Sequence, residues 1–183
     1  MSNNNNNNSI DSLKSVISKR GGLALQNRFK LEITPPSSVS GDTRDFTILC
    51  ESCTLPSKQI LTMDYQSIRQ TQKIANGYIN EDVTFNFILT NDYIVRKLFD
   101  QWSGLVINFN TYRAGYQADY GGTINIYQLA KAENGSEDDK VVYGVRLKKA
   151  FPTTFSSITL DNNSDNTIQK YSVTVAFEDF ETI

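Results

Sequence analysis

Cys50 and Cys53 carry the most reactive side chains of this chain, and only two residues separate them. A Cys-x-x-Cys pair performs thiol–disulfide exchange when it opens a helix after a strand, and binds zinc when a second pair of ligands follows. Here the pair trails a predicted strand, meets a turn at Pro56 and has no second ligand pair after it. We therefore expect two free cysteines rather than a redox or metal site.

Histidine is absent from the whole sequence of 183 residues. Its absence excludes Ser-His and Cys-His nucleophilic catalysis and every His-based zinc site. Two carboxylates could still hydrolyse a glycosidic bond, but the acidic residues cluster in turns and at the carboxy terminus, in no pattern that implies a cleft. We expect no catalytic residue, no cofactor and no metal ion, and a structural or binding protein rather than an enzyme.

The formal net charge is −2, from 18 basic and 20 acidic residues. Tight, general binding of nucleic acid needs a basic face that neutralises phosphates, and this balance offers no such excess. No apolar run approaches the ~20 residues of a membrane-spanning helix, and the amino terminus lacks the basic-then-apolar order of a signal peptide. We expect a protein that is synthesised in the cytoplasm and does not insert into a membrane.

A strand followed directly by a helix is predicted between residues 83 and 102. In residues 83–89 apolar and polar side chains alternate, as they do on a half-buried strand. Thr90, Asn91 and Asp92 offer side chains that can cap the helix, and Gly104 is expected to end it. Apolar residues at helical spacing define its predicted packing core: Ile94, Val95, Leu98, Phe99 and Trp102.

Alternating segments predict further strands at residues 29–33, 45–50, 105–109, 123–129, 141–150 and 171–177. In segment 45–50 the side chains of Phe46, Ile48 and Cys50 should share one face, and Phe151-Pro152 should break the strand that begins at 141. The expected fold class is mainly β: a β-barrel or sandwich of two antiparallel sheets with one packed α-helix at about 91–103. Residues 57–79 are expected to form a long polar hairpin.

The first 20 residues differ from the rest. Residues 3–8 are six consecutive asparagines, which cannot bury enough apolar area to offset the entropy lost on ordering. Residues 9–20 predict a short helix that Ser9 can cap and Gly21-Gly22 ends, and its apolar face needs cover from its own domain or from a neighbour. We expect a flexible arm at 1–20 and one β domain at 21–183.

The order of these segments resembles that of the tail tube proteins of contractile-tailed bacteriophages. The resemblance lies in the strand at 27–33, the segment 46–56 with its Leu-Pro turn, the strand and helix between 83 and 102, and the segments between 150 and 177. It implies a fold shared with the inner tube of type VI secretion systems, and hexameric rings that stack into a hollow tube of the virion tail. The implied partners are other copies of the chain, a contractile sheath, a baseplate tube initiator and a tail terminator, with DNA only as passing cargo.

Within this resemblance, the hairpin at 57–79 is interpreted as a contact with the next ring, because it is too polar for a core element and too long for an idle loop. An ordinary surface hairpin is the alternative. The candidate interface residues are Gln59, Ile60, Leu61, Met63, Tyr65, Ile68, Arg69 and Lys73. DNA must slide without sticking, so we expect a neutral-to-negative bore. Candidate charges for the bore or the ring ends, each equally readable as an ordinary surface charge, are Glu32, Asp138, Asp139, Glu178, Asp179 and Glu181.

Three other functions stay open at this stage. The chain could be a baseplate paralogue that initiates the tube, or the inner tube of a contractile injection or secretion system, and both would share the fold. A carbohydrate-binding β-sandwich is a more distant alternative. It should remain a monomer, whereas a tube subunit should form rings or filaments when it is concentrated.

Overall fold

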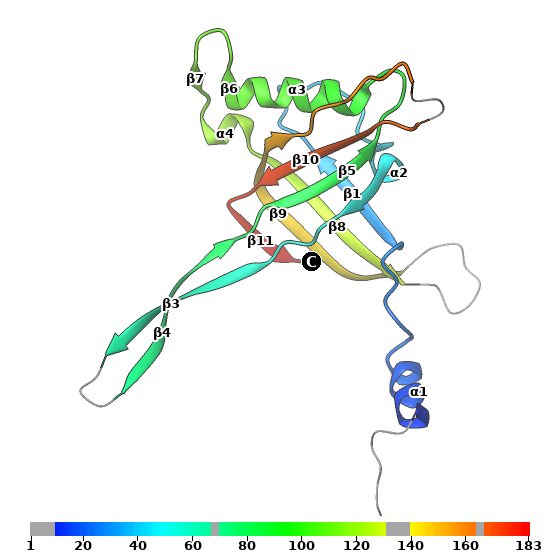
Figure 1. Ribbon diagram of the computed structural model, residues 1–183, viewed down its shortest axis with the longest axis vertical. Coiled ribbons are helices and arrows are strands. Elements are labelled where there is room, and N and C mark those ends of the chain that lie inside the picture. The colour runs from blue at the N-terminus through cyan, green and yellow to red at the C-terminus, as the bar shows by residue number, and fades with distance from the viewer. Residues whose placement is uncertain (1–9, 67–69, 131–139, 164–166) are drawn as a thin grey trace, which may run out of the picture.

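The computed structural model describes residues 10–66, 70–130, 140–163 and 167–183 (Figure 1). The asparagine tract, the cap at Ser9, and the candidate residues Ile68, Arg69, Asp138 and Asp139 lie outside the described residues.

Within these residues, seven strands form one antiparallel sheet that curls into two halves with β9 in common. One half contains β1 (Phe29–Thr34), β8 (Gly122–Ala130), β9 (Lys140–Phe155) and β11 (Asp179–Thr182). The other half contains the end of β9, β10 (Lys170–Ala176), β5 (Val83–Ile88) and β2 (Cys50–Cys53). This architecture confirms the prediction of a mainly β fold built from two antiparallel sheets.

Strand β9 turns the corner between the two halves at a bulge. Lys149 has a φ of 50°, and the register between β8 and β9 shifts beside it. The buried positions change from Val145 and Leu147 before the bulge to Ala150 and Pro152 after it, so one strand faces the core in both halves. The prediction that Phe151-Pro152 breaks the strand is therefore wrong, because β9 passes through both residues and pairs them with β10.

The segment predicted as a strand at 45–50 begins with a single helical turn, α2 (Phe46–Leu49). Phe46 is buried against the rings of Phe87 and Phe99, whereas Ile48 is 81% exposed, so the predicted shared face does not exist. The Thr47 hydroxyl donates a hydrogen bond to the Leu31 carbonyl on β1. Helix α2 lies in the connection that takes the chain from β1, at one end of the strand order, to β2, at the other.

Helix α3 (Ile94–Val106) packs over one end of the curled sheet (Figure 1). Val95, Leu98, Phe99 and Trp102 are buried, and Ile94 is partly buried. The N-cap position is Tyr93, with a φ of 54° and no side-chain cap bond, but among the predicted capping residues Asp92 Oδ1 accepts a 3.4 Å hydrogen bond from the Ile94 amide at the start of the helix. The helix also continues through Gly104 to Val106, after which the predicted strand at 105–109 shrinks to β6 (Ile107–Asn108), paired with β7 (Arg113–Ala114).

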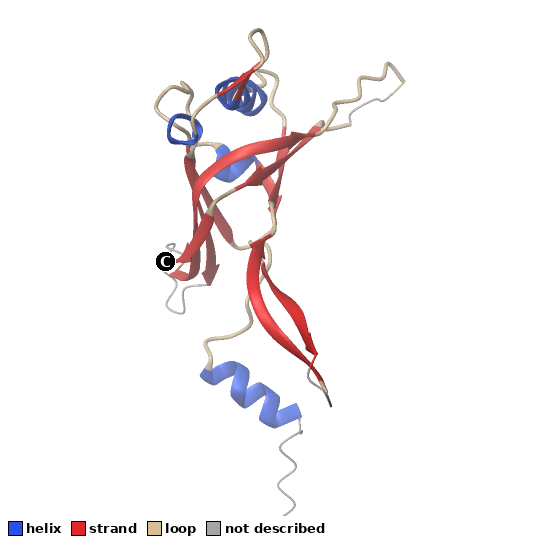
Figure 2. Cartoon of the chain, turned by 90° about the vertical axis from the view of Figure 1, so that its left-hand side faces the viewer, coloured by secondary structure: helices blue, strands red, loops and turns tan. Residues whose placement is uncertain are grey.

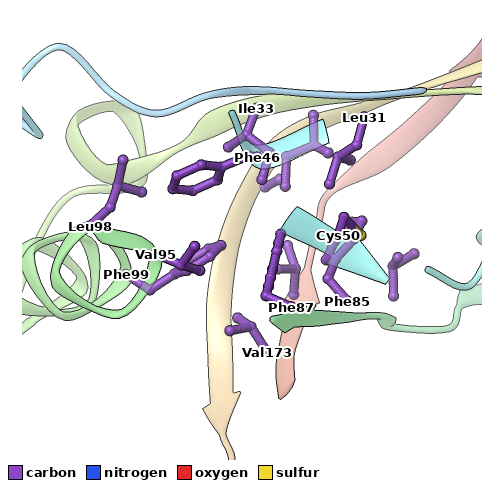
Figure 3. Packing of buried hydrophobic residues seen from close by; sticks show 14 of the residues in the cluster. Leu31, Ile33, Phe46, Cys50, Phe85, Phe87, Val95, Leu98, Phe99 and Val173 are labelled. Atoms are coloured by element: carbon purple, nitrogen blue, oxygen red, sulfur yellow. The ribbon is translucent and has the colours of Figure 1, made fainter. Parts of the chain in front are cut away.

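The core lies between the sheet halves and is closed by α2 and α3 (Figure 3). Alternate residues of β1, β5, β8 and β10 point into it, including Phe85 and Phe87 from β5 and Val173 from β10. The indole of Trp102 lies parallel to the ring of Phe99 at 6.0 Å, and its Nε1 donates a 2.7 Å hydrogen bond to the Tyr120 carbonyl of α4 (Gln117–Tyr120). The body of the protein thus has a complete apolar interior.

Candidate assembly surfaces

The side chains that could perform chemistry, the two cysteines and the acidic residues, form neither a disulfide nor a metal site within the described ranges. Among the described residues, no three His, Cys, Asp or Glu side chains are grouped so that they could hold a metal ion. Both cysteines are free, as predicted. Burial raises the pKa of Cys50 to about 12 and that of Cys53 to about 11, so both thiols stay protonated at neutral pH and are poor nucleophiles. No helix in the described ranges is long and apolar enough to cross a membrane.

The most conspicuous surface is the predicted hairpin, which is confirmed as β3 (Lys58–Gln66) paired with β4 (Thr71–Asn80). It extends away from the body at the end opposite α3 (Figures 1 and 2). Every described residue of the two strands except Asn80 is exposed. An isolated two-stranded hairpin is marginally stable in water, so this element needs a partner surface.

The two faces of the hairpin differ in polarity. Cross-strand partners share a face, and a bulge beside Leu61 and Thr62 keeps the alternation of β3 and β4 in step. One face, which we call the apolar hairpin face, contains Leu61, Met63, Tyr65, Ile74 and Ile79. The opposite face has Ile60 and Tyr78 near the body, and farther out carries Thr62, Ala75, Asp64 and Lys73. The outer part of the hairpin is therefore a ribbon with one apolar face and one more polar face.

The base of the hairpin is tied to the body. The Lys58 ammonium lies 3.0 Å from the Asp179 carboxylate and 4.5 Å from the centre of the Phe180 ring. Asn80 Nδ2 donates a 3.0 Å hydrogen bond to the Glu178 carbonyl. These contacts with β11 and its approach fix the direction in which the ribbon leaves the body.

The structure brings most of the predicted interface residues together on this ribbon. Gln59, Ile60, Leu61, Met63 and Tyr65 lie on β3, and Lys73 lies on β4. The sequence analysis missed Ile74, Tyr78 and Ile79, which are 46%, 56% and 50% exposed. The signal that finds them is the hairpin register, because Ile74 lies opposite Met63 and Tyr78 opposite Ile60.

A second exposed apolar surface belongs to helix α1 (Ile10–Lys19). Ile10, Leu13 and Val16 are 72%, 60% and 56% exposed, and no residue of this described helix is buried. The helix ends as predicted at Gly21 and Gly22, whose φ values are 79° and 98°, with the Gly22 amide donating to the Ile17 carbonyl at 2.9 Å. The cover that this face needs does not come from the described part of its own chain.

The candidate bore charges in the described residues are all engaged in ion pairs. Glu32 lies 2.7 Å from Lys30, Glu181 lies 2.6 Å from Lys148, and Glu178 lies 2.5 Å from Lys149. Asp179 pairs with Lys58 at the base of the hairpin. A hydrogen bond from the neighbouring lysine lowers the pKa of Glu32, Asp179 and Glu181, so they remain charged at neutral pH. Each negative charge is balanced by its neighbour.

Known proteins are similar in sequence to this chain. The family model described as phage tail tube protein matches residues 24–183. The tail tube protein gp19 of Enterobacteria phage T4 is 24% identical over 162 residues, which cover 88% of this chain and 93% of that protein. The gp19 protein of Enterobacteria phage T6 is 25% identical with the same coverage.

Solved structures show the same fold. A chain of the anti-feeding prophage baseplate superimposes with a TM-score of 0.62 at 11% identity, covering 88% of this chain and 95% of that one. A chain of the PVC sheath–tube complex, from an extracellular contractile injection system, gives a TM-score of 0.62 at 17% identity, covering 88% and 91%. Since the family model spans the entire β body, the chain belongs to the phage tail tube protein family and is a structural component of a phage tail rather than an enzyme.

Proposed function

We propose that copies of this chain close into rings of six, and that the rings stack into the hollow tube through which DNA leaves the virion. The observation that carries this proposal is the β3–β4 hairpin, whose described residues are almost all exposed and whose one face is apolar. Exposed apolar surfaces of this kind mark interaction sites. A head-to-tail contact that closes by rotation gives a ring, and one that does not close gives a filament, so a tube needs both.

The proposed hairpin contact is with the next ring. The ribbon leaves the body on the side opposite α3, and its length of nine to ten residues a strand corresponds to about 30 Å. A contractile sheath around the tube, a baseplate initiator below it and a terminator above it are the further partners that we propose, with synthesis in the host cytoplasm.

The proposed bore is neutral to negative. A site that neutralises ~6–10 phosphates would hold DNA strongly at low salt and obstruct its passage. The balanced ion pairs along β9 and β11 fit this requirement, because they leave few unpaired cations for phosphates to bind. A basic bore in a reconstruction of the assembled tube would overturn this part of the proposal.

Deleting residues 60–76 tests the hairpin contact. The body should keep its far-ultraviolet circular dichroism and form rings, but the rings should not stack into tubes under negative-stain electron microscopy. The matched control replaces Asp64 alone by alanine, which leaves the hairpin, its apolar face and the candidate interface residues in place, and it should still form tubes. Long tubes from the deletion variant would refute the inter-ring role.

The same images separate the alternatives that share the fold. A tube subunit extends into long tubes at high concentration, whereas a baseplate initiator stops after one or a few rings. A wild-type chain that stays monomeric in size-exclusion chromatography at every concentration would refute self-assembly itself. Tubes recovered from virions with DNA inside distinguish a phage tail from an injection system that carries none.

A further inference from the structure

Helix α1 is too short to be stable without a partner. It has ten residues, and isolated helices of fewer than ~12–15 residues are marginal in water. Its polar side chains lie on one side, while Ile10, Leu13, Val16 and Ile17 lie on the other. Residues 10–23 also lie outside the matched family segment, which begins at residue 24.

The hairpin has no helix packed on its apolar face, and α1 has an exposed apolar face of its own. A two-stranded ribbon becomes stable when a helix packs on it, and the apolar hairpin face is the side on which that helix would lie. From Ile79, which lies opposite Gln59, to Tyr65 this face extends for about 20 Å, at ~3.3 Å per residue. Helix α1 is about 15 Å long, at 1.5 Å per residue. The helix therefore fits within the length of the apolar hairpin face, and both surfaces are exposed in the single chain.

We propose that α1 of one copy packs lengthwise on the apolar hairpin face of a second copy. This proposal rests on the proposed assembly of copies and names the partner of the hairpin within it. The helix covers one face of the ribbon, and the opposite face, with Ile60 and Tyr78, stays available for another ring.

The partner helix comes from a neighbouring copy because of the way the two elements diverge. Both extend from the end of the body opposite α3, but on either side of it, so that one chain holds them apart (Figure 1). A second copy placed so that its helix lies next to this hairpin makes a head-to-tail contact with it, of the kind from which stacked assemblies are built.

The arm has the reach that this contact requires. It is anchored where Gln128 Nε2 donates hydrogen bonds of 2.8 Å and 2.9 Å to the carbonyls of Leu25 and Arg28. The five residues between this anchor and α1 span up to about 17 Å when extended, and the helix adds about 15 Å. Gly21 and Gly22 adopt positive φ values, so the chain changes direction there and the axis of α1 points away from the direction of the residues that follow.

Cross-linking of mixed single-cysteine additions tests the proposal in the full chain. Chains carrying Val16→Cys are mixed with chains carrying Met63→Cys, assembled, and treated with a short bis-maleimide. The matched control mixes Ser15→Cys, on the polar side of α1, with Asp64→Cys, on the polar side of the hairpin. Cys50 is buried and Cys53 is half-buried, so wild-type chains treated in the same way measure the background cross-linking of the native thiols.

We expect at least tenfold more cross-linked dimer from the first mixture than from the control mixture. A further variant carries both Val16→Cys and Met63→Cys in one chain. If this variant forms the cross-link within itself while the mixture of single variants gives no dimer, the assignment of the contact to a second copy is overturned. Normal tubes with equal, low yields from both mixtures would overturn the α1–hairpin contact and leave the proposed function standing. Absence of rings and tubes from the wild-type chain is the separate failure of the proposed function, and the contact falls with it.

Discussion

Gly122 faces the ring of Trp102, and this close approach makes Gly122→Ala a sharp test of how the helix α3 is held on the sheet. A Cβ atom at residue 122 would lie 2.5 Å from Trp102 Cζ2, 2.7 Å from Cη2 and 2.9 Å from the Thr34 carbonyl oxygen. Carbon atoms in contact are ordinarily about 3.5–4.0 Å apart, so the indole would have to move by about 1 Å.

The indole has little freedom to move. It is fully buried, it lies parallel to the Phe99 ring, and its Nε1 is hydrogen-bonded to the Tyr120 carbonyl at 2.7 Å. Overpacking of a filled core costs about 1–3 kcal/mol, and a pinned ring places this site in the upper part of that range, at about 2–3 kcal/mol. The matched control is Gly104→Ala inside α3, where a Cβ would meet nothing within 4 Å. That change should stabilise the protein by about 0.5–1 kcal/mol.

The assay is urea unfolding of unassembled protein, followed by the fluorescence of the single tryptophan. With an m-value of about 2 kcal/mol per molar urea, Gly122→Ala should lower the midpoint by about 1 M or more. Gly104→Ala should raise it by about 0.3–0.5 M at the same m-value. If both variants move the midpoint in the same direction, or Gly122→Ala leaves it unchanged, the close packing of Trp102 on β8 is refuted.

Two further predictions concern titration. The native thiols of Cys50 and Cys53 should resist a maleimide at pH 8 and react once urea unfolds the chain, because burial raises the pKa of both; rapid labelling of the folded protein would contradict this. Burial also raises the pKa of the Tyr171 phenol to about 12, so its contribution to stability is complete below pH 10 and is lost between pH 10 and 12, as the unfolded chain ionises. The loss approaches about 3 kcal/mol once the pH exceeds both pKa values. Between pH 8 and pH 11 the urea midpoint of Tyr171→Phe should fall less than that of the wild-type protein, and an equally steep fall in the variant would exclude this origin.

The sheet and the helix α3 could be predicted from sequence because their periodicity directly reports which side faces the core. Strand β5 alternates cleanly, and Val83, Phe85 and Phe87 are all fully buried. The wrong predictions fall where the chain changes direction. Alternation at 46–50 could not reveal that Ile48 faces solvent while Phe46 and Cys50 face the core, and the Pro152 signal concealed a strand that bends at Lys149 instead.

The hairpin was predictable as an element but not as a surface. Polarity and length indicated two extended limbs, whereas the side on which apolar residues gather depends on the register and on the bulge beside Leu61. The acidic residues were likewise visible in the sequence, but the ion pairs of Asp179 and Glu181 join β11 to the hairpin base and to β9, which no local pattern brings together. The corrections therefore concern long-range pairing, which composition and period do not specify.

The distribution of apolar residues separates folding from assembly in this protein. The body buries a continuous core and, among its described residues, no polar side chain is fully buried with it, so it has what it needs to fold as a single chain. Helix α1 and the β3–β4 hairpin carry apolar side chains that remain exposed, and each is marginal by itself. In the proposed assembly these elements are held in place when copies meet, and the entropy lost in ordering them weakens every isolated pairwise contact. A tube built this way should grow where several such contacts form at once, which favours addition to an existing ring over association of free subunits.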